Sequence, residues 1–185
     1  MDMVELYRRA QDGFDTVLAG VGADQWNVPS TCTEWSVRDV AGHVIWAQRQ
    51  LRAWATGEDY AEVGGPGSEH PAAVVPGDPV AAWRAAREAA DATLTEETLK
   101  IPVAAMGGMP LAAIVALLTT DTVTHGWDIG HALGQDVKLD PDVVSAAFDW
   151  SRANVMRRPG FFGPELSAPE GADEQTRMLA FLGRA

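Results

Sequence analysis

Apolar residues recur every three or four positions along most of the chain, the spacing of one face of an α-helix. The longest such run opens at Pro110 and ends near Gly134. Two more runs, over residues 2–19 and 37–56, are each followed by a glycine, which often terminates helices. Alternation of apolar and polar residues is not convincing anywhere, so we expect no regular β-strand.

Aspartate-proline pairs mark the start of two further helices. Asp78 and Asp140 each precede a proline, an arrangement typical of a helix N-terminus, and they predict helices over 79–94 and 141–156. A short last helix is predicted from Asp173. Helices joined by loops favour an all-α fold in a single domain over residues 1–185. We predict an up-and-down four-helix bundle with one or two additional C-terminal helices.

The connection over residues 57–78 is long for a compact domain. It is rich in glycine and proline, with Gly64-Gly65-Pro66-Gly67 near its centre. Loops of this length are either functional lids or disordered segments, and an ordered lid would favour an enzyme. Residues 99–109 fit either a short extended segment or a turn.

Two polar residues interrupt the apolar face of the 110–134 helix. After Ile114 and Leu118, the same stripe continues with Asp121 and His125. Burying an unpaired carboxylate costs several kcal/mol or more. Side chains four residues apart can reach one atom, so a bound metal ion explains both. Alternatively, Asp121 caps a shorter helix or accepts a hydrogen bond from His125 as a structural pair.

His43 is the third candidate ligand, because it lies beside the apolar stripe of the 37–56 helix. If the two helices face each other, His43 and His125 converge on Asp121. This donor set suits Zn²⁺, our first candidate, as well as Ni²⁺, Fe²⁺ and Mn²⁺. Three ligands leave a position for water or substrate. The alternative is that His43 is a hydrogen-bonded core residue.

Two carboxylates are spaced to support the ligand imidazoles. Asp128 lies three residues after His125, and Asp39 four residues before His43, so either could accept the second ring N–H. For Asp39 we favour a different role, as part of a capping box with Ser36.

Other side chains near these motifs have plainer interpretations. Trp35 and Trp127 could wall the pocket, although most tryptophans serve the core. We expect His70 and His131 at the surface or in packing, and we do not favour Cys32 as a nucleophile.

The composition argues against several classes of function. The net charge of -12 argues against binding to nucleic acid and against binding to anionic membrane surfaces. The N-terminus lacks the features of a signal peptide, and no apolar run approaches the ~18 residues that span a bilayer. A single cysteine suits a reducing cytoplasm. The sequence is compatible with a homodimer.

Three segments carry a resemblance to a known family. They are residues 31–43, which contain Cys-x-x-Trp-x-Val-x-Asp-x-x-x-His, residues 121–128, which read Asp-x-x-x-His-Gly-Trp-Asp, and residues 177–184. Together they resemble the actinobacterial DinB-like metalloproteins, in the branch of the mycothiol-dependent maleylpyruvate isomerase N-terminal domain. The resemblance covers nearly the whole chain.

The resemblance implies a four-helix bundle that binds a divalent metal through His43, Asp121 and His125. It also implies a thiol-dependent isomerase or S-transferase that uses mycothiol, with the metal holding the thiol as thiolate. Asp121 stands where the named isomerase has Glu, and Thr31 where Pro is common. We expect no counterpart of the isomerase's additional C-terminal domain in this chain.

Three functional hypotheses follow. The leading one is a cytoplasmic metal-dependent enzyme that uses a low-molecular-weight thiol to act on a small electrophile. The second is a metal-binding protein without turnover. The third is metal-assisted hydrolysis, which needs a base such as Asp128. Beyond the three candidate metal ligands, the sequence identifies neither a catalytic nor a cofactor-binding residue.

Overall fold

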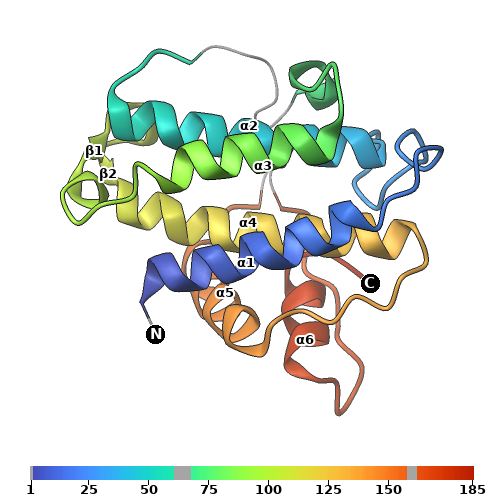
Figure 1. Ribbon diagram of the computed structural model, residues 1–185. Coiled ribbons are helices and arrows are strands. Elements are labelled where there is room, and N and C mark those ends of the chain that lie inside the picture. The colour runs from blue at the N-terminus through green and yellow to red at the C-terminus, as the bar shows by residue number, and fades with distance from the viewer. Residues whose placement is uncertain (1, 61–67, 158–161) are drawn as a thin grey trace.

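The computed structural model describes residues 2–60, 68–157 and 162–185. The described chain is mostly helical, which confirms the predicted all-α fold (Figure 1). Its α-helices are α1 (Met3–Ala19), α2 (Val37–Thr56), α3 (Pro79–Asp91), α4 (Leu111–Ala132), α5 (Pro141–Asn154) and α6 (Glu174–Phe181). No helix in these ranges has both the length and the apolar content needed to cross a membrane.

Local capping explains where several helices begin. The Ser36 hydroxyl accepts a hydrogen bond from the Asp39 N–H, and the Asp39 carboxylate accepts one from the Ser36 N–H. This capping box confirms the role that we favoured for Asp39. Asp78 and Asp140 cap α3 and α5 as predicted.

Helix α3 ends before the predicted Leu94. The Ala90 carbonyl accepts hydrogen bonds from both the backbone N–H and the hydroxyl of Thr93, at 2.9 and 2.7 Å, so the last turn tightens to i→i+3 bonds as the helix ends. Residues 102–103 and 109–110 form a small antiparallel pair, β1 and β2. A turn between them brings these two extended dipeptides together, so the 99–109 stretch, which fitted either an extended segment or a turn, contains both, although no alternating pattern predicted a strand.

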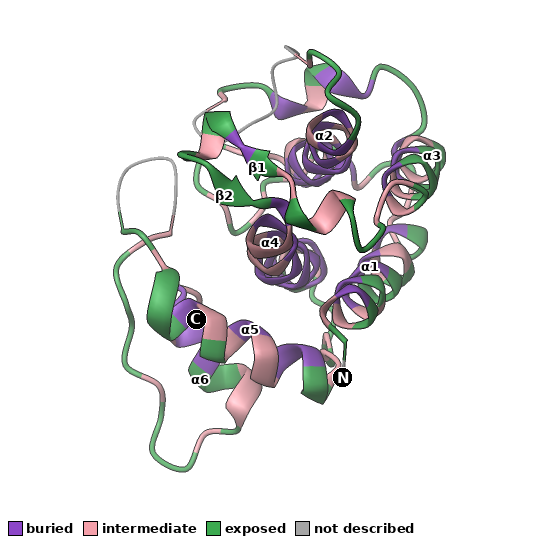
Figure 2. Cartoon of the chain, turned by 90° about the vertical axis from the view of Figure 1, so that its left-hand side faces the viewer, coloured by how far each residue is buried: buried purple, intermediate pink, exposed green. Residues whose placement is uncertain are grey.

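Helices α1 to α4 form the bundle, which Figure 2 shows nearly end-on. Trp83, early in α3, and Val40, early in α2, belong to one part of the core, while Ala90 and Leu51, nearer the other ends of these helices, belong to another. Helices α2 and α3 are therefore parallel, and the strict alternation of an up-and-down bundle does not hold between them. A helix the length of α2 spans about 30 Å, and the 57–78 connection is long enough to return the chain along it.

The later part of this connection is docked on α2. Residues Pro71–Val74 form a 3-10 turn, and the Ala72 N–H donates to Asp39 at 3.0 Å. A Cβ at Gly42 would collide with the Pro71 carbonyl and lie 2.9 Å from the Ala72 nitrogen. Glycine at this position therefore lets the connection contact the helix backbone. The stretch 61–67, which includes Gly64-Gly65-Pro66-Gly67, lies outside the described residues.

The apolar core has three parts. One joins α1, α2 and α3 around Trp83, and a second joins α2 and α4 around Leu51 and Ile114. The third packs α5 and α6 against α1 and α4, outside the four-helix bundle (Figure 2). The candidate ligands lie where α2 and α4 face each other.

Two glycine-to-alanine changes test this packing. Gly42→Ala should lower the free energy of unfolding by about 1–3 kcal/mol, because the docked turn must move. Gly13→Ala, inside α1 with no atom within 4 Å of the added Cβ, should raise it by about 0.5–1 kcal/mol. Urea denaturation measures both, and equal shifts in the two variants would contradict the docking.

Candidate metal centre

Facing turns of α2 and α4 bring His43, Asp121 and His125 together. The Nε2 atom of His43 lies 3.5 Å from Asp121 Oδ2, and the Nε2 atom of His125 lies 3.4 Å from Asp121 Oδ1. The two imidazole centroids are 5.1 Å apart. The three residues that the sequence nominated as ligands thus share one place in the fold.

The spacing fits a tetrahedral metal ion. Ligand atoms 2.0–2.2 Å from zinc lie roughly 3.4 Å from one another at tetrahedral angles. Both measured nitrogen–oxygen distances are close to that value, and the donor atoms of all three side chains lie within 4.8 Å of one another. Among the described residues, buried Asp121 Oδ2 has no hydrogen-bond partner. A cation would satisfy this oxygen, which is otherwise costly to bury.

The electrostatics of the three residues are coupled. Burial opposes ionisation of Asp121, but the charges of His125 and His43 outweigh it and hold the pKa of Asp121 well below its usual range. Burial also disfavours the charged form of His125, yet Asp121, Asp128 and Cys32 raise its pKa well above 6.5. Without a metal, the site therefore keeps a proton on His125, and a cation would replace that proton.

Aromatic rings enclose the two imidazoles. The Trp35 ring lies 5.2 Å from His43 and 6.3 Å from His125, and Trp46 stacks on His43 at 6.0 Å. The Trp35 indole N–H donates to the Ser68 carbonyl at 3.0 Å. Trp35 is thus a wall of the site. Its hydrogen bond to Ser68 connects this wall to the later part of the 57–78 connection.

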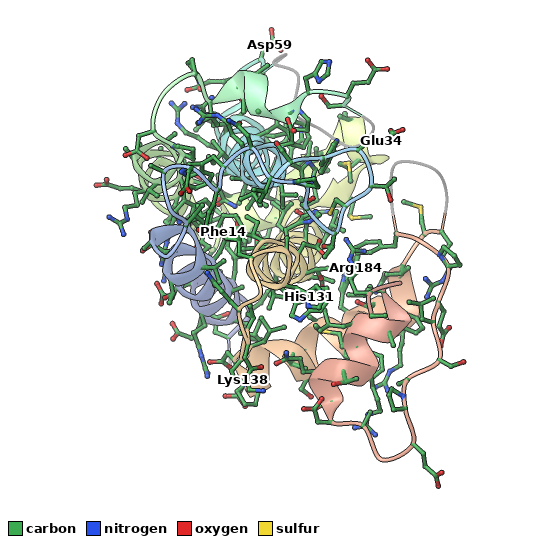
Figure 3. All side chains as sticks on the ribbon, turned by 90° about the vertical axis from the view of Figure 1, so that its right-hand side faces the viewer. Phe14, Glu34, Asp59, His131, Lys138 and Arg184 are labelled. Atoms are coloured by element: carbon green, nitrogen blue, oxygen red, sulfur yellow. The ribbon has the colours of Figure 1, made fainter. Side chains whose placement is uncertain are left out.

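The loop that presents Trp35 is strained. Glu34, labelled in Figure 3, has a φ of 74°, in the left-handed region that residues other than glycine seldom adopt. It is the one non-glycine residue with positive φ in the described ranges. Such strain persists where the surrounding structure imposes it, and here Trp35 follows directly.

Asp128 lies behind His125 and gathers donors from distant segments. Its carboxylate is fully buried and accepts the Nδ1–H of His125 at 2.9 Å. It also accepts the Thr31 hydroxyl at 2.6 Å and the Cys32 thiol at 3.2 Å. Arg184 donates to both oxygens, at 3.0 and 3.2 Å. With Nδ1–H donated to Asp128, the His125 Nε2 atom faces Asp121.

The charges on Asp128 are balanced locally. Burial opposes its ionisation, but the hydrogen bond from His125 and the charge of Arg184 hold its pKa well below the ordinary range. Cys32, His125 and Asp128 also lie close enough to form a second potential metal site. The guanidinium of Arg184 already supplies a cation there, so we favour the first grouping.

Other predicted residues lie elsewhere. Trp127 is not a wall of the site, because it packs into the third core part and stacks on His131 at 4.3 Å. His70 and His131 are exposed, as expected. Sequence reasoning missed the contacts of Cys32 and Arg184 with the site. The resemblance of residues 177–184 was the one signal pointing to Arg184.

Comparison with known proteins identifies the family of this chain. A family model described as the mycothiol maleylpyruvate isomerase N-terminal domain matches residues 7–130, which include His43, Asp121 and His125. The chain belongs to this family. Membership associates it with mycothiol-related, metal-associated enzyme domains and agrees with the resemblance found in the sequence.

The names of the proteins similar to this chain state no reaction. An uncharacterised protein found in two strains of Mycobacterium tuberculosis is 34% identical over 190 residues, covering 100% of this chain and 98% of the relative. Another uncharacterised protein of that organism is 28% identical over 144 residues, covering 69% of this chain and 54% of the relative. No solved structure gives a significant match.

The raised pKa of His125 predicts how stability depends on pH in the metal-free protein. The stabilisation from protonated His125 is fully present below the unfolded pKa of about 6.5, and it is lost as pH rises through the folded pKa. The stability advantage over His125→Gln should therefore shrink as pH increases from about 6.5. Urea denaturation of both proteins across a pH series measures this difference, and an advantage that grew with pH would contradict it.

Proposed function

We propose that His43, Asp121 and His125 bind a divalent metal ion, with zinc as first candidate, in a cytoplasmic thiol-dependent enzyme. Its thiol would be mycothiol or a similar small thiol, and its reaction S-transfer to, or isomerisation of, a small electrophile. The observation that carries this proposal is the unpartnered, buried Asp121 oxygen with imidazole nitrogens 3.4 and 3.5 Å from the carboxylate.

A divalent ion held here would lower the pKa of a coordinated thiol, supplying a thiolate nucleophile near neutral pH. The protein's own part is to hold three donors and leave further coordination positions open. Asp128 orients His125, so that Nε2 faces the site. Trp35 lies against both imidazoles and Trp46 against that of His43, and both histidines are buried.

Two alternatives carry less support. Metal-assisted hydrolysis needs a protein base, and Asp128 is a poor one because it is fully buried and already accepts from four side chains. A metal-binding protein without turnover would not need the 57–78 connection at the site. The Trp35–Ser68 hydrogen bond ties that connection to a wall of the site and so favours catalysis.

Removing a ligand should remove the metal. Protein purified after growth with zinc should contain about one equivalent, whereas His43→Ala and His125→Ala should lose most of it. His70→Ala serves as a control, because this side chain is exposed and outside the site. Elemental analysis measures the content, and unchanged zinc in both ligand variants would remove the basis of the proposal.

Turnover should depend on an added thiol. With chlorodinitrobenzene as a test electrophile, the thiolate sulfur would form a bond to the ring carbon and chloride would leave. We expect zinc-loaded protein to accelerate this reaction with mycothiol or cysteine, and His125→Ala to abolish the acceleration. Release of product from an ester substrate without any thiol would instead support the hydrolase.

A further inference from the structure

Arg184 reaches the candidate metal centre because of the way α6 ends. The Gly183 N–H donates to the Ala180 carbonyl and the Arg184 N–H to the Leu179 carbonyl, both at 2.9 Å. With Gly183 at a φ of 81°, this is a Schellman motif with Arg184 immediately after the glycine. A Cβ at Gly183 would also lie 2.8 Å from the Pro164 carbonyl oxygen. Glycine is therefore required for the turn that directs Arg184 inward.

The guanidinium of Arg184 grips Asp128 at two points. Nη2 lies 3.0 Å from Oδ2 and Nε lies 3.2 Å from Oδ1, while Nη1 donates to the Leu182 carbonyl at 2.9 Å. The Arg184 side chain is only 15% exposed. Figure 3 shows Arg184 between α6 and α4. A bidentate pair of this kind fixes the plane of the carboxylate, which a single ammonium contact would not do.

The orientation of Asp128 in turn controls the His125 ring. Asp128 Oδ2, which Arg184 contacts, is the same oxygen that accepts the Nδ1–H of His125. Thr31 and Cys32 also contact the carboxylate, through a hydroxyl and a sulfur atom, and come from a loop rather than a helix. Among the described residues, Arg184 is the one cation outside the metal centre that contacts Asp128, so without it the carboxylate would be free to rotate away from His125.

We propose that Arg184 is a positioning residue for the metal centre, acting on the His125 ligand through Asp128. This inference rests on the proposed metal function. The end of α6 therefore helps to hold the His125 ring in place, although it lies more than fifty residues away along the chain.

Zinc affinity is the first test. Competition with a chromogenic chelator should show a tenfold to hundredfold weaker affinity in Arg184→Ala, roughly the effect of losing a partner behind a metal ligand. Arg184→Lys, which keeps the charge but not the two-point contact, should lose less. Arg177→Ala removes the same charge from an exposed position on α6 and should match the wild type.

Ring-proton exchange in the metal-free protein is the second test. Nδ1 of His125 donates to Asp128, so NMR should detect this proton as slowly exchanging in the wild type. It should exchange much faster in Arg184→Ala. A folded Arg184→Ala protein with unchanged exchange and unchanged zinc affinity would overturn the inference. A wild type that binds no zinc would overturn the proposed function instead, and the exchange measurement would still decide the role of Arg184.

A variant that keeps the Arg184 guanidinium tests whether its orientation, and not only its charge, positions His125. Gly183→Ala should shift the Schellman turn and speed the exchange of the His125 Nδ1 proton, because the left-handed turn and the Pro164 contact both oppose a Cβ. Urea denaturation checks that each variant is folded. If Arg184→Ala is unfolded, Arg184→Lys and Gly183→Ala decide the question, and wild-type exchange in both would refute the proposal.

Discussion

A carboxylate buried between two imidazoles is the constraint on which the rest of the site depends. Asp121 and His125 interrupt an otherwise apolar stripe of α4, and the buried Oδ2 atom of Asp121 has no hydrogen-bond partner in the described structure. An uncompensated charge in such a place would be costly, so the fold has to supply a cation or a proton. Protonated His125 meets this need in the metal-free protein, and a metal ion would meet it more fully.

The bundle topology makes this arrangement possible. The 57–78 connection joins α2 to α3, which lies parallel to α2, and α4 lies against α2 on another side (Figure 2). The middle of α2 then faces the turn of α4 that carries Asp121 and His125. The same connection docks at Gly42, one residue before His43, and contacts Trp35 through Ser68. Packing that defines the fold therefore also encloses the candidate metal centre.

The His125 ring is held in place through Asp128, which contacts side chains from segments far apart along the chain. Thr31 and Cys32 precede α2, and Arg184 follows α6, yet all three converge on Asp128. Asp128 carries a negative charge that Arg184 offsets, whereas Asp121 carries one that is left for a proton or a metal. Two aspartates seven residues apart on one helix thus have different partners and serve different purposes.

Local pattern was enough to locate the helices, their capping residues and the polar interruption at Asp121 and His125, because these features depend on neighbours within one or two turns. It also nominated His43, since imidazoles on apolar helix faces are few. The parallel course of α2 and α3, the choice of Trp35 over Trp127 as a wall, and the contacts of Cys32 and Arg184 could not be inferred in this way. They join residues that are distant along the chain, and no local periodicity encodes which distant surfaces meet; that depends on how the whole core packs.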